Sequence, residues 1–363
     1  MPVKLRVCPI CQSDSPKSLE WFIADENRIN PYALSHIRDT TVLKKMELVI
    51  CTQCACVYYR FIPTDISTMY KNDYRKIEDL ESRLRGSGNH KKNILWHSLL
   101  NNIIKPGMRV LDIGCSEGFF VKFLRDRGVD AEGLEINDLS VSFGRDKFKV
   151  PIHHCDVLTL KADKYDLVFN SGYLEHVENP RAVLDHIRTE LLTDKGFLYV
   201  QTPNVFEPNQ TYLSQFFPPE HFQTFSPKTL PYLASLCGFK AIFEQYDLFN
   251  CGMAFVFRVS PEKKELPVPS FLESEHRFLD IHSNYCAMLS NKTFQPITTF
   301  LSYVLLNNAM NKKSFQLHPF HGDYSYTQII ISLLQKIHLN EAYGVYEKIG
   351  DHLKKHGYHR PTV

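Results

Sequence analysis

Residues 110–118 read VLDIGCSEG and decide the fold of this chain. An apolar run that resembles a β-strand leads to Asp112, and Gly114 and Gly118 follow just before a run with helical apolar spacing. Gly114 can turn the backbone without a Cβ, and Gly118 lets the helix start press against the strand. A pyrophosphate site would need the spacing GxGxxG. The acid ahead of Gly114 instead favours a ligand without phosphates that carries a cationic amino group.

The sequence around this loop alternates between strand-like and helical runs. Strands are predicted over residues 109–113, 130–135, 150–155, 165–170 and 197–201, with helical segments between them, such as residues 119–127. This alternation predicts an α/β fold with a doubly wound (Rossmann-like), mostly parallel sheet that helices cover on both faces. Two later runs, residues 239–246 and 253–259, are joined by only a short turn, so they must pair antiparallel and provide an antiparallel last strand.

Further polar residues fall where predicted strands end, and open α/β sheets bind ligands at that edge. Glu135 can accept hydrogen bonds from both hydroxyls of a ribose, and Asp156 can accept one from an adenine amino group. Asn170 would lie beside the reactive end of the ligand. The predicted cofactor-binding residues are Asp112, Gly114, Cys115, Gly118, Glu135, Ile136, Asp156, Val157 and Asn170.

Four of the ten cysteines form two CxxC pairs, Cys8 with Cys11 and Cys51 with Cys54. Two thiolates at this spacing bind one face of a tetrahedral ion, and two such pairs complete a zinc site. No coordination position stays open, so this zinc would fold the domain and not catalyse. Cys56 could substitute for Cys54, and four unrelated core cysteines are the alternative to a metal site.

The overall composition is that of an ordinary globular protein, with 44% hydrophobic and 23% charged residues. A net charge of +2 gives no basic face for long nucleic acid, so we expect no such partner.

No apolar run reaches the ~18 residues that a membrane span needs. The N-terminus runs into the first cysteine pair without room for a signal peptide. We therefore expect a cytoplasmic protein without a membrane partner, where disulfides are rare.

The chain divides by composition and pattern. We expect a zinc-binding module over residues 1–66, a linker with helices over 67–107, the ligand-binding domain over 108–260 and a mostly helical region over 261–363. The last region carries no motif that points to chemistry. It would pack against a second subunit, which makes a homo-oligomer, or close the cleft.

Residues 108–260 resemble the class I S-adenosylmethionine-dependent methyltransferases. The motifs that carry the resemblance are VLDIGCxxG, LEIN at 134–137, YDLVFN at 165–170, LEHVxxP at 174–180, EHFxxFSPxTL from Glu220 and CGF at 237–239. Ser116 stands where most members have glycine, and serine is small enough to keep the loop. The resemblance implies S-adenosylmethionine as the cofactor and methyl transfer as the reaction.

Residues 1–260 are also similar to the zinc-containing C-methyltransferases that act on nucleotide-linked deoxysugars. Those proteins place two CxxC pairs and a Tyr-rich strip ahead of the methyltransferase domain. The last third of this chain departs from them, because it does not carry their glycine-rich α/β domain. The similarity implies a small-molecule acceptor, either a sugar nucleotide or a related carbohydrate intermediate.

Methyl transfer needs an aligned nucleophile and, for a hydroxyl or a carbon acid, a base that removes its proton. Histidine has a pKa suited to this task. His221 is the first candidate, because the matching histidine of the resembling family faces the substrate and is interpreted as the base. Its alternative role is to brace the loop through hydrogen bonds. Tyr70 and Tyr74 are weaker candidates for holding or polarising the acceptor.

Glu175 and His176 suggest a further site. Some methyltransferases that act on small RNAs and quinol precursors bind a divalent cation through Glu-x-x-Glu-His, but Gly172 occupies the first of those positions here. We therefore expect Glu175 to cap a helix and His176 to pack or to contact the cofactor.

Two rival functions use the same residues. One is an RNA methyltransferase whose zinc module holds nucleic acid, and the near-neutral charge counts against it. The other is a non-catalytic cofactor-binding or scaffold protein, and the intact acids Asp112, Glu135 and Asp156 count against it.

Overall fold

The computed structural model describes residues 2–19, 45–64, 70–71, 103–206, 217, 220–247, 252–260 and 265–279. Several expectations concern other parts of the chain. Tyr74, most of the linker over 67–107 and the helical region beyond residue 279 lie outside the described residues. Those expectations stay predictions.

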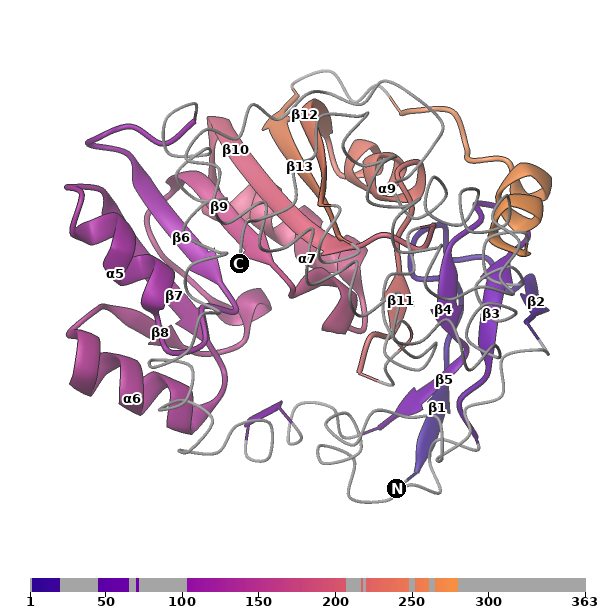
Figure 1. Ribbon diagram of the computed structural model, residues 1–363, viewed down its shortest axis with the longest axis horizontal. Coiled ribbons are helices and arrows are strands. Elements are labelled where there is room, and N and C mark those ends of the chain that lie inside the picture. Colours follow the sequence, from indigo (N-terminus) through magenta and orange to yellow (C-terminus); the bar gives the residue numbers. More distant parts are fainter. Residues whose placement is uncertain are drawn as a thin grey trace, which may run out of the picture.

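A seven-stranded sheet forms the centre of the fold (Figure 1). Its strands are β6 (Arg109–Ile113), β7 (Asp130–Glu135), β8 (Ile152–His154), β9 (Tyr165–Ser171), β10 (Leu192–Pro203), β12 (Phe239–Asp247) and β13 (Gly252–Val259). Their spatial order is β12-β13-β10-β9-β6-β7-β8. The strands from β6 to β10 pair in parallel, whereas β13 is antiparallel to both β10 and β12. The predicted Rossmann-like sheet, with its antiparallel last strand, is confirmed.

Helices cover both faces of this sheet. They are α5 (Phe119–Arg125), α6 (Asp138–Phe148), α7 (Pro180–His186) and α9 (Thr229–Leu236). Phe120 of α5 shares a hydrophobic core with Val110 of β6, and Leu184 of α7 shares a second core with Leu111 of the same strand. Because successive side chains of a strand point to opposite faces, neighbouring residues of β6 anchor the two helical layers.

Asparagine side chains begin two of these helices. Asn137 accepts a hydrogen bond from Ser140 N at 2.9 Å at the start of α6. Asn179 accepts one from Ala182 N at 3.0 Å at the start of α7, and Pro180 follows it in the first turn. Such caps satisfy backbone N–H groups that the helix itself cannot pair. Asn137 comes directly after β7, so its cap also fixes the loop at the carboxyl end of that strand.

The N-terminal residues form a module of small sheets beside the central sheet (Figure 1). Its strands are β1 (Val3–Leu5), β2 (Pro16–Ser18), β3 (Leu48–Cys51), β4 (Val57–Tyr59), β5 (Phe61–Pro63) and β11 (Gln223–Thr224). One sheet has the order β11-β4-β3-β2, and β1 pairs with β5. β11 comes from the domain expected over residues 108–260, and it pairs antiparallel with β4. The two expected domains therefore share a sheet.

Residues 271–279 form a helix against this N-terminal module (Figure 1). Phe278 is fully buried in the same core as Leu48 of β3. Glu275 pairs with Lys17 of β2 at 2.6 Å. This described part of the expected helical region packs on its own chain.

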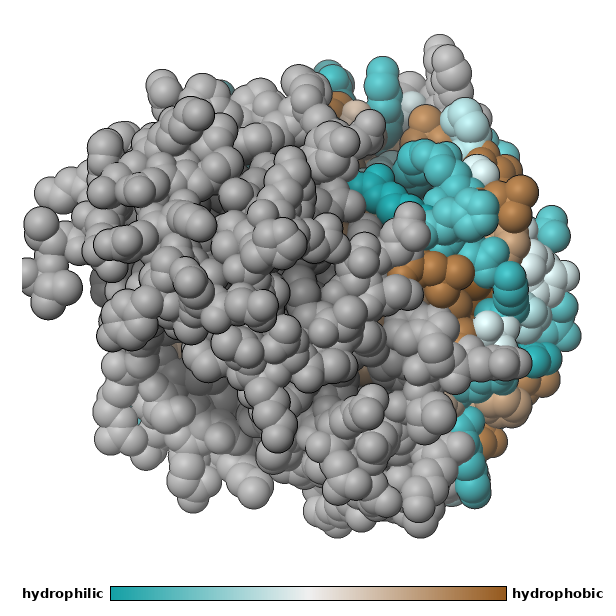
Figure 2. Space-filling model, turned by 45° about the vertical axis from the view of Figure 1, so that its right-hand side comes forward, coloured by the Kyte–Doolittle hydropathy of each residue, from teal (hydrophilic) through white to brown (hydrophobic). Residues whose placement is uncertain are grey.

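The surface seen in Figure 2 interleaves hydrophilic and hydrophobic residues along its coloured edge. Such mixing is ordinary, because a folded protein has too little polar surface to cover itself. Within the described ranges, no helix combines the length and the hydropathy that crossing a membrane would require.

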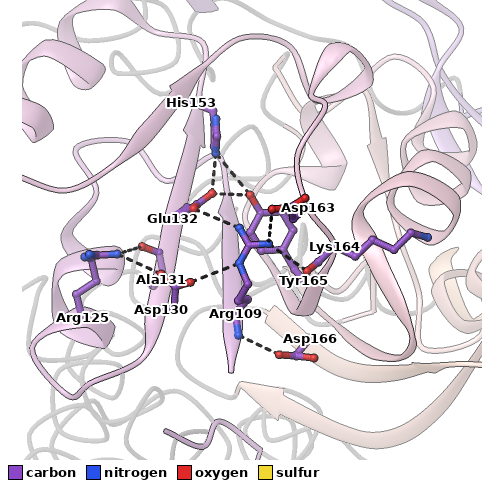
Figure 3. Close-up of polar contacts among 10 residues, drawn as sticks. All are labelled: Arg109, Arg125, Asp130, Ala131, Glu132, His153, Asp163, Lys164, Tyr165 and Asp166. Carbon is purple, nitrogen blue, oxygen red and sulfur yellow. Dashed lines mark hydrogen bonds and ion pairs between the residues drawn. The ribbon is translucent and has the colours of Figure 1, made fainter. Parts of the chain in front are cut away.

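A polar cluster ties the parallel strands together near their amino ends (Figure 3). Glu132 of β7 accepts hydrogen bonds from the Tyr165 hydroxyl at 2.7 Å and from His153 Nε2 at 2.8 Å. Arg109 of β6 approaches the same carboxylate at 3.4 Å. Burial by itself would raise the pKa of Glu132, but the two hydrogen bonds and the neighbouring positive charge lower it overall. The charged form of Glu132 therefore stabilises the fold.

We expect Glu132→Gln to lower the free energy of unfolding by about 1.5–3 kcal/mol at neutral pH, the range for hydrogen bonds to charged groups. Because the folded-state pKa of Glu132 is lowered, this contribution is fully present above the unfolded pKa of about 4.3 and is lost as the pH falls through the folded value. Chemical denaturation across pH measures both effects. Asp163→Asn is the control, since that side chain is 98% exposed. A Glu132→Gln penalty that persists unchanged at the acid end would contradict the assignment.

Candidate functional site

A cavity of about 640 Å³ opens beyond the carboxyl ends of β6, β7, β8 and β9. Among the predicted cofactor residues, those that line it are Asp112, Gly114, Cys115, Glu135, Ile136, Asp156 and Val157. Tyr70 lines it as well, together with Tyr173 and His176. The cavity therefore brings together side chains from four successive strand ends, as the sequence pattern predicted.

The loop after β6 is left-handed at three alternate positions. Gly114 has φ +70°, and a Cβ there would lie 2.9 Å from the Tyr173 ring. Gly118 has φ +74°, and a Cβ there would lie 2.8 Å from Val150. Gly118 does not line the cavity, so it serves helix packing and not ligand contact. Ser116, with φ +51°, adopts a conformation that glycine tolerates better, which explains why glycine is usual at this position.

Glu135 closes β7 and holds this loop. One carboxylate oxygen accepts from Ser116 N at 2.9 Å, and the other accepts from Ile136 N at 2.8 Å and Asn137 N at 2.9 Å. An ionised carboxylate has about four acceptor positions, so capacity remains for a ligand hydroxyl. Glu135 thus has a structural role that the sequence did not reveal, and its contact with a ligand stays a prediction.

Asp156 and Cys115 occupy two further walls of the cavity. Asp156 Oδ1 accepts from Leu158 N at 2.8 Å and so caps the short helix η4 (Val157–Thr159). Cys115 packs so closely on β7 that a Cβ at Gly133 would lie 2.5 Å from its sulfur. Burial, followed by the charges of Asp112 and Glu135, raises the pKa of the Cys115 thiol. Cys115 is therefore a small neutral wall residue.

Asn170 departs from its predicted position beside the ligand. Its neighbours Phe169 and Ser171 line the cavity, whereas the fully buried Asn170 does not. The reason is strand alternation, which turns every second side chain of β9 to the other face of the sheet. Both polar atoms of the Asn170 amide are buried without a hydrogen-bond partner among the described residues.

Asn137 places Tyr70 at the cavity. Its Nδ2 donates to the backbone oxygens of Tyr70 at 2.9 Å and Lys71 at 3.0 Å, while its Oδ1 caps α6. The Tyr70 hydroxyl lies 2.7 Å from His176 Nδ1. Asn137 was missed as a functional residue, although an asparagine directly after a strand and before a helix is a recognisable cap signal.

His176 and His221 form a pair at the wall of the cavity. Their ring centroids are 4.6 Å apart, with the rings nearly perpendicular. Of the two, only His176 is among the residues that line the cavity. His176 Nδ1 is 3.0 Å from the backbone oxygen of Glu220. A carbonyl oxygen only accepts, so we assign the proton to Nδ1 and the lone pair to Nε2.

Burial shifts the pKa values of titratable groups at the histidine pair toward their neutral forms. Burial, and then the neighbouring His176, holds the pKa of His221 well below its usual range. Burial also raises the pKa of Glu220 to about 7. Glu175 does not cap a helix as expected, because it lies within the short helix η5 (Leu174–His176), whose cap position is Tyr173.

Arg6 connects the N-terminal module to this part of the site. Its guanidinium donates to the backbone oxygens of Phe222 at 3.0 Å and Glu178 at 2.6 Å, and to Gln223 Oε1 at 2.9 Å. Gln223 Nε2 in turn donates to the backbone oxygens of Leu174 at 2.8 Å and Val177 at 2.9 Å. The loops on both sides of the histidine pair are therefore held by one buried side chain of the module.

The four predicted metal-ligating cysteines converge in the N-terminal module. The sulfurs of Cys8, Cys11, Cys51 and Cys54 all lie within 4.8 Å of one another. Cys56 is outside this group.

The two pairs end in matching turns, because Gln12 and Ala55 both adopt left-handed backbone conformations. Contacts with the other three sulfurs, and then burial, raise the pKa of Cys54, so four bare thiolates would not persist together without a cation. The group could hold one metal ion.

Part of this chain is similar to known proteins. A family model described as methyltransferase domain matches residues 88–243. The chain is 28% identical over 108 residues to a ubiquinone biosynthesis O-methyltransferase of Bordetella avium (strain 197N), a match that covers 27% of this chain and 44% of that protein. It is 25% identical over 109 residues to the protein of the same name from Acinetobacter baumannii (strain ACICU), covering 27% and 45%. The chain thus spans less than half the length of these relatives.

Among solved structures, a SAM dependent methyltransferase from Archaeoglobus fulgidus is 20% identical, with a TM-score of 0.41. That match covers 50% of this chain and 100% of the other. The family match over residues 88–243 includes the strands from β6 to β10 and the loop that lines the cavity, but not β13. Residues 88–243, 156 of the 363 residues, thus match a methyltransferase domain.

Proposed function

We propose that the protein transfers the methyl group of S-adenosylmethionine to a small-molecule acceptor, either a sugar nucleotide or a related carbohydrate intermediate, with a histidine general base. The cavity at the strand ends supports the proposal, because three acids line it where strands end. Asp112 would receive the cationic amino group, Glu135 the ribose hydroxyls and Asp156 the adenine amino group. The cofactor supplies a methyl group on a positively charged sulfur, which is a good leaving group.

The chain's own residues would handle the acceptor. The cavity wall formed by Tyr70 and His176 lies next to the cofactor-binding residues, so an acceptor there could be aligned for in-line attack. His176 Nε2 is the atom suited to take the acceptor's proton, since its Nδ1 is occupied by Tyr70 and the Glu220 carbonyl. His221 supports the ring of His176 edge-on, or shares the proton with it.

Two observations favour a small molecule over RNA as the acceptor. The net charge of +2 gives little attraction for a polyanion. The matched relatives are named as O-methyltransferases of ubiquinone biosynthesis, which places a small molecule among the acceptors of related domains. The carbohydrate assignment rests on the paired cysteine motifs and Tyr70 ahead of the domain, which resemble the sugar C-methyltransferases.

We further propose that the four cysteines hold one structural zinc ion. The Cys8 and Cys54 sulfurs are 3.5 Å apart, and those of Cys11 and Cys51 are 3.6 Å apart. A tetrahedral site with Zn–S bonds of about 2.3 Å places sulfurs roughly 3.8 Å apart, so a small adjustment accommodates the ion. Four protein ligands would leave no open coordination position, and the zinc would stabilise the module that presents Arg6.

Transfer of labelled methyl groups tests the proposed activity. The purified full chain is incubated with S-adenosylmethionine carrying a radiolabelled methyl group and with nucleotide-linked deoxysugars, a quinol or bulk RNA. Label is expected in the sugar nucleotides. Label found only in the quinol would replace the carbohydrate assignment, and label found only in RNA would overturn the small-molecule proposal. If calorimetry detects no binding of S-adenosylmethionine to the chain, a non-catalytic scaffold protein becomes the remaining hypothesis.

We expect Asp112→Asn to weaken binding of S-adenosylmethionine about ten- to hundredfold, because a hydrogen bond to a charged partner contributes about 1.5–3 kcal/mol. Isothermal calorimetry measures the dissociation constant. Asp126→Asn, on the exposed end of α5, is the matched control and should change it less than about twofold. Equal affinities for Asp112→Asn and the native chain would remove Asp112 from the cofactor site.

We expect the purified chain to contain about one zinc ion, and Cys54→Ser to lose it and to melt at a lower temperature. Elemental analysis measures the metal, and calorimetry measures the melting temperature. Cys56→Ser is the control, because Cys56 lies next to the cluster without belonging to it. Metal retained in Cys54→Ser but lost in Cys56→Ser would reassign the fourth ligand.

The two histidines can be separated by substitution. We expect His176→Asn to lower turnover at least about a hundredfold, the usual contribution of a general base, while the affinity for S-adenosylmethionine changes less than about twofold. His221→Asn should also lower turnover if it shares the proton. Unchanged turnover in His221→Asn would limit that residue to bracing the loop, and unchanged turnover in both variants would exclude a histidine base.

A further inference from the structure

Glu175 is a buried carboxyl group next to the histidine pair that the proposed reaction has not yet used. Its side chain is 2% exposed, and its Oε2 has no hydrogen-bond partner within the described part of the chain. A buried carboxyl oxygen without a partner is unfavourable and rare in folded proteins. Against the effect of burial, an interaction with the Thr202 side chain lowers the pKa of Glu175, so the carboxyl group is not wholly isolated, but its Oε2 stays available for a further partner.

The partner that geometry offers is the histidine pair. A carboxylate oxygen of Glu175 and ring nitrogens of His176 and His221 all lie within 4.8 Å of one another. His221 Nδ1 is also buried without a hydrogen-bond partner among the described residues. Glu175 and His221 are thus close enough for their charges to interact, although no hydrogen bond joins Glu175 Oε2 to His221 Nδ1 in the described structure.

Proton transfer to a histidine would create a positive charge in this buried region. Such a charge is costly unless an opposite charge lies nearby, and a carboxylate within about 4–6 Å strongly favours the imidazolium form. The other titratable groups around the pair are Tyr70, through its hydroxyl, and Glu220, whose backbone oxygen faces His176. The grouping within 4.8 Å includes Glu175 and does not include Glu220.

We propose that Glu175 is the positioning residue of the base, and that its carboxylate stabilises the imidazolium formed when His176 or His221 accepts the acceptor's proton. This inference rests on the proposed methyl transfer. The acceptor's proton moves to an imidazole nitrogen, and the electron pair of the acceptor forms the new bond to the methyl carbon. The sulfur keeps the electron pair of the broken carbon–sulfur bond. Glu175 changes no covalent bond.

The burial of Glu175 also supports this role. It raises the pKa of Glu175 to about 7, which is close to that of an ordinary imidazole. The arrangement parallels the general requirement that a catalytic histidine be oriented and stabilised by an acid behind it.

The test is a titration of the histidines in the full chain, and it needs no knowledge of the acceptor. Histidine side chains are labelled with carbon-13, and the resonances of the pair are assigned from His176→Asn and His221→Asn. NMR spectra are recorded across pH with S-adenosylmethionine bound. We expect Glu175→Gln to lower the titration midpoint of at least one of the two histidines by about one pH unit or more. Glu190→Gln, an exposed residue on η6 (Ile187–Leu191), should leave both midpoints unchanged.

A second variant distinguishes the loss of the Glu175 charge from a general disturbance of the fold. Glu175→Asp keeps the charge, so its midpoint should lie above that of Glu175→Gln. Equal midpoints in these two variants, or an unchanged midpoint in Glu175→Gln, would overturn the inference. Magnesium or manganese ions are then added to the native chain. Specific shifts or broadening at His176 and His221 would assign the cluster to a cation instead and would also overturn it.

The same samples separate the two proposals. Loss of S-adenosylmethionine binding in the native chain, measured by calorimetry, would defeat the proposed methyl transfer. Intact cofactor binding with histidine midpoints that do not respond to Glu175→Gln would defeat only the role of Glu175.

Discussion

The pairing of β11 with β4 is the constraint on which the acceptor half of the site depends. It takes Gln223 and Thr224 out of the methyltransferase domain and into the sheet of the N-terminal module. His221 stands just before this strand, and Arg6 of the module donates to Phe222 beside it. Because strand pairing and a buried guanidinium hold the same segment, the module sets where the histidine pair lies, whereas the glycine loop sets where the cofactor would lie.

The two halves of the cavity therefore differ in charge. Asp112, Glu135 and Asp156 make the cofactor half acidic, which suits a ligand with positive charge on its sulfur and amino group. The wall that would face the acceptor contains Tyr70 and His176, and burial shifts the pKa values of the adjacent His221 and Glu175 toward their neutral forms. A neutral imidazole can accept a proton, and a nearby buried acid can then compensate the charge. Under the proposed function, cofactor attraction and proton removal would belong to different elements of the chain.

The sequence was sufficient for the parts of the site that depend on local pattern. The loop around Gly114 and the acids at the strand ends were predicted because each follows its strand directly. The convergence of Cys8 and Cys54 followed from the spacing of each pair. Strand alternation, which turned Asn170 away from the cavity, depends on the exact register that a pattern leaves open. The cavity position of His176 and the β11 crossing depend on contacts between distant segments, which periodicity does not encode.

The crossing of β11 has a consequence for how the chain folds during synthesis. The cysteine pairs and β4 are made early, but the strand that completes their sheet ends at Thr224. The buried Arg6 finds its partners Phe222 and Gln223 at the same late point. Contacts between residues so far apart in sequence form slowly, because a long loop must close first. The N-terminal module therefore reaches its final form only after most of the methyltransferase domain has left the ribosome, and the two regions mature together.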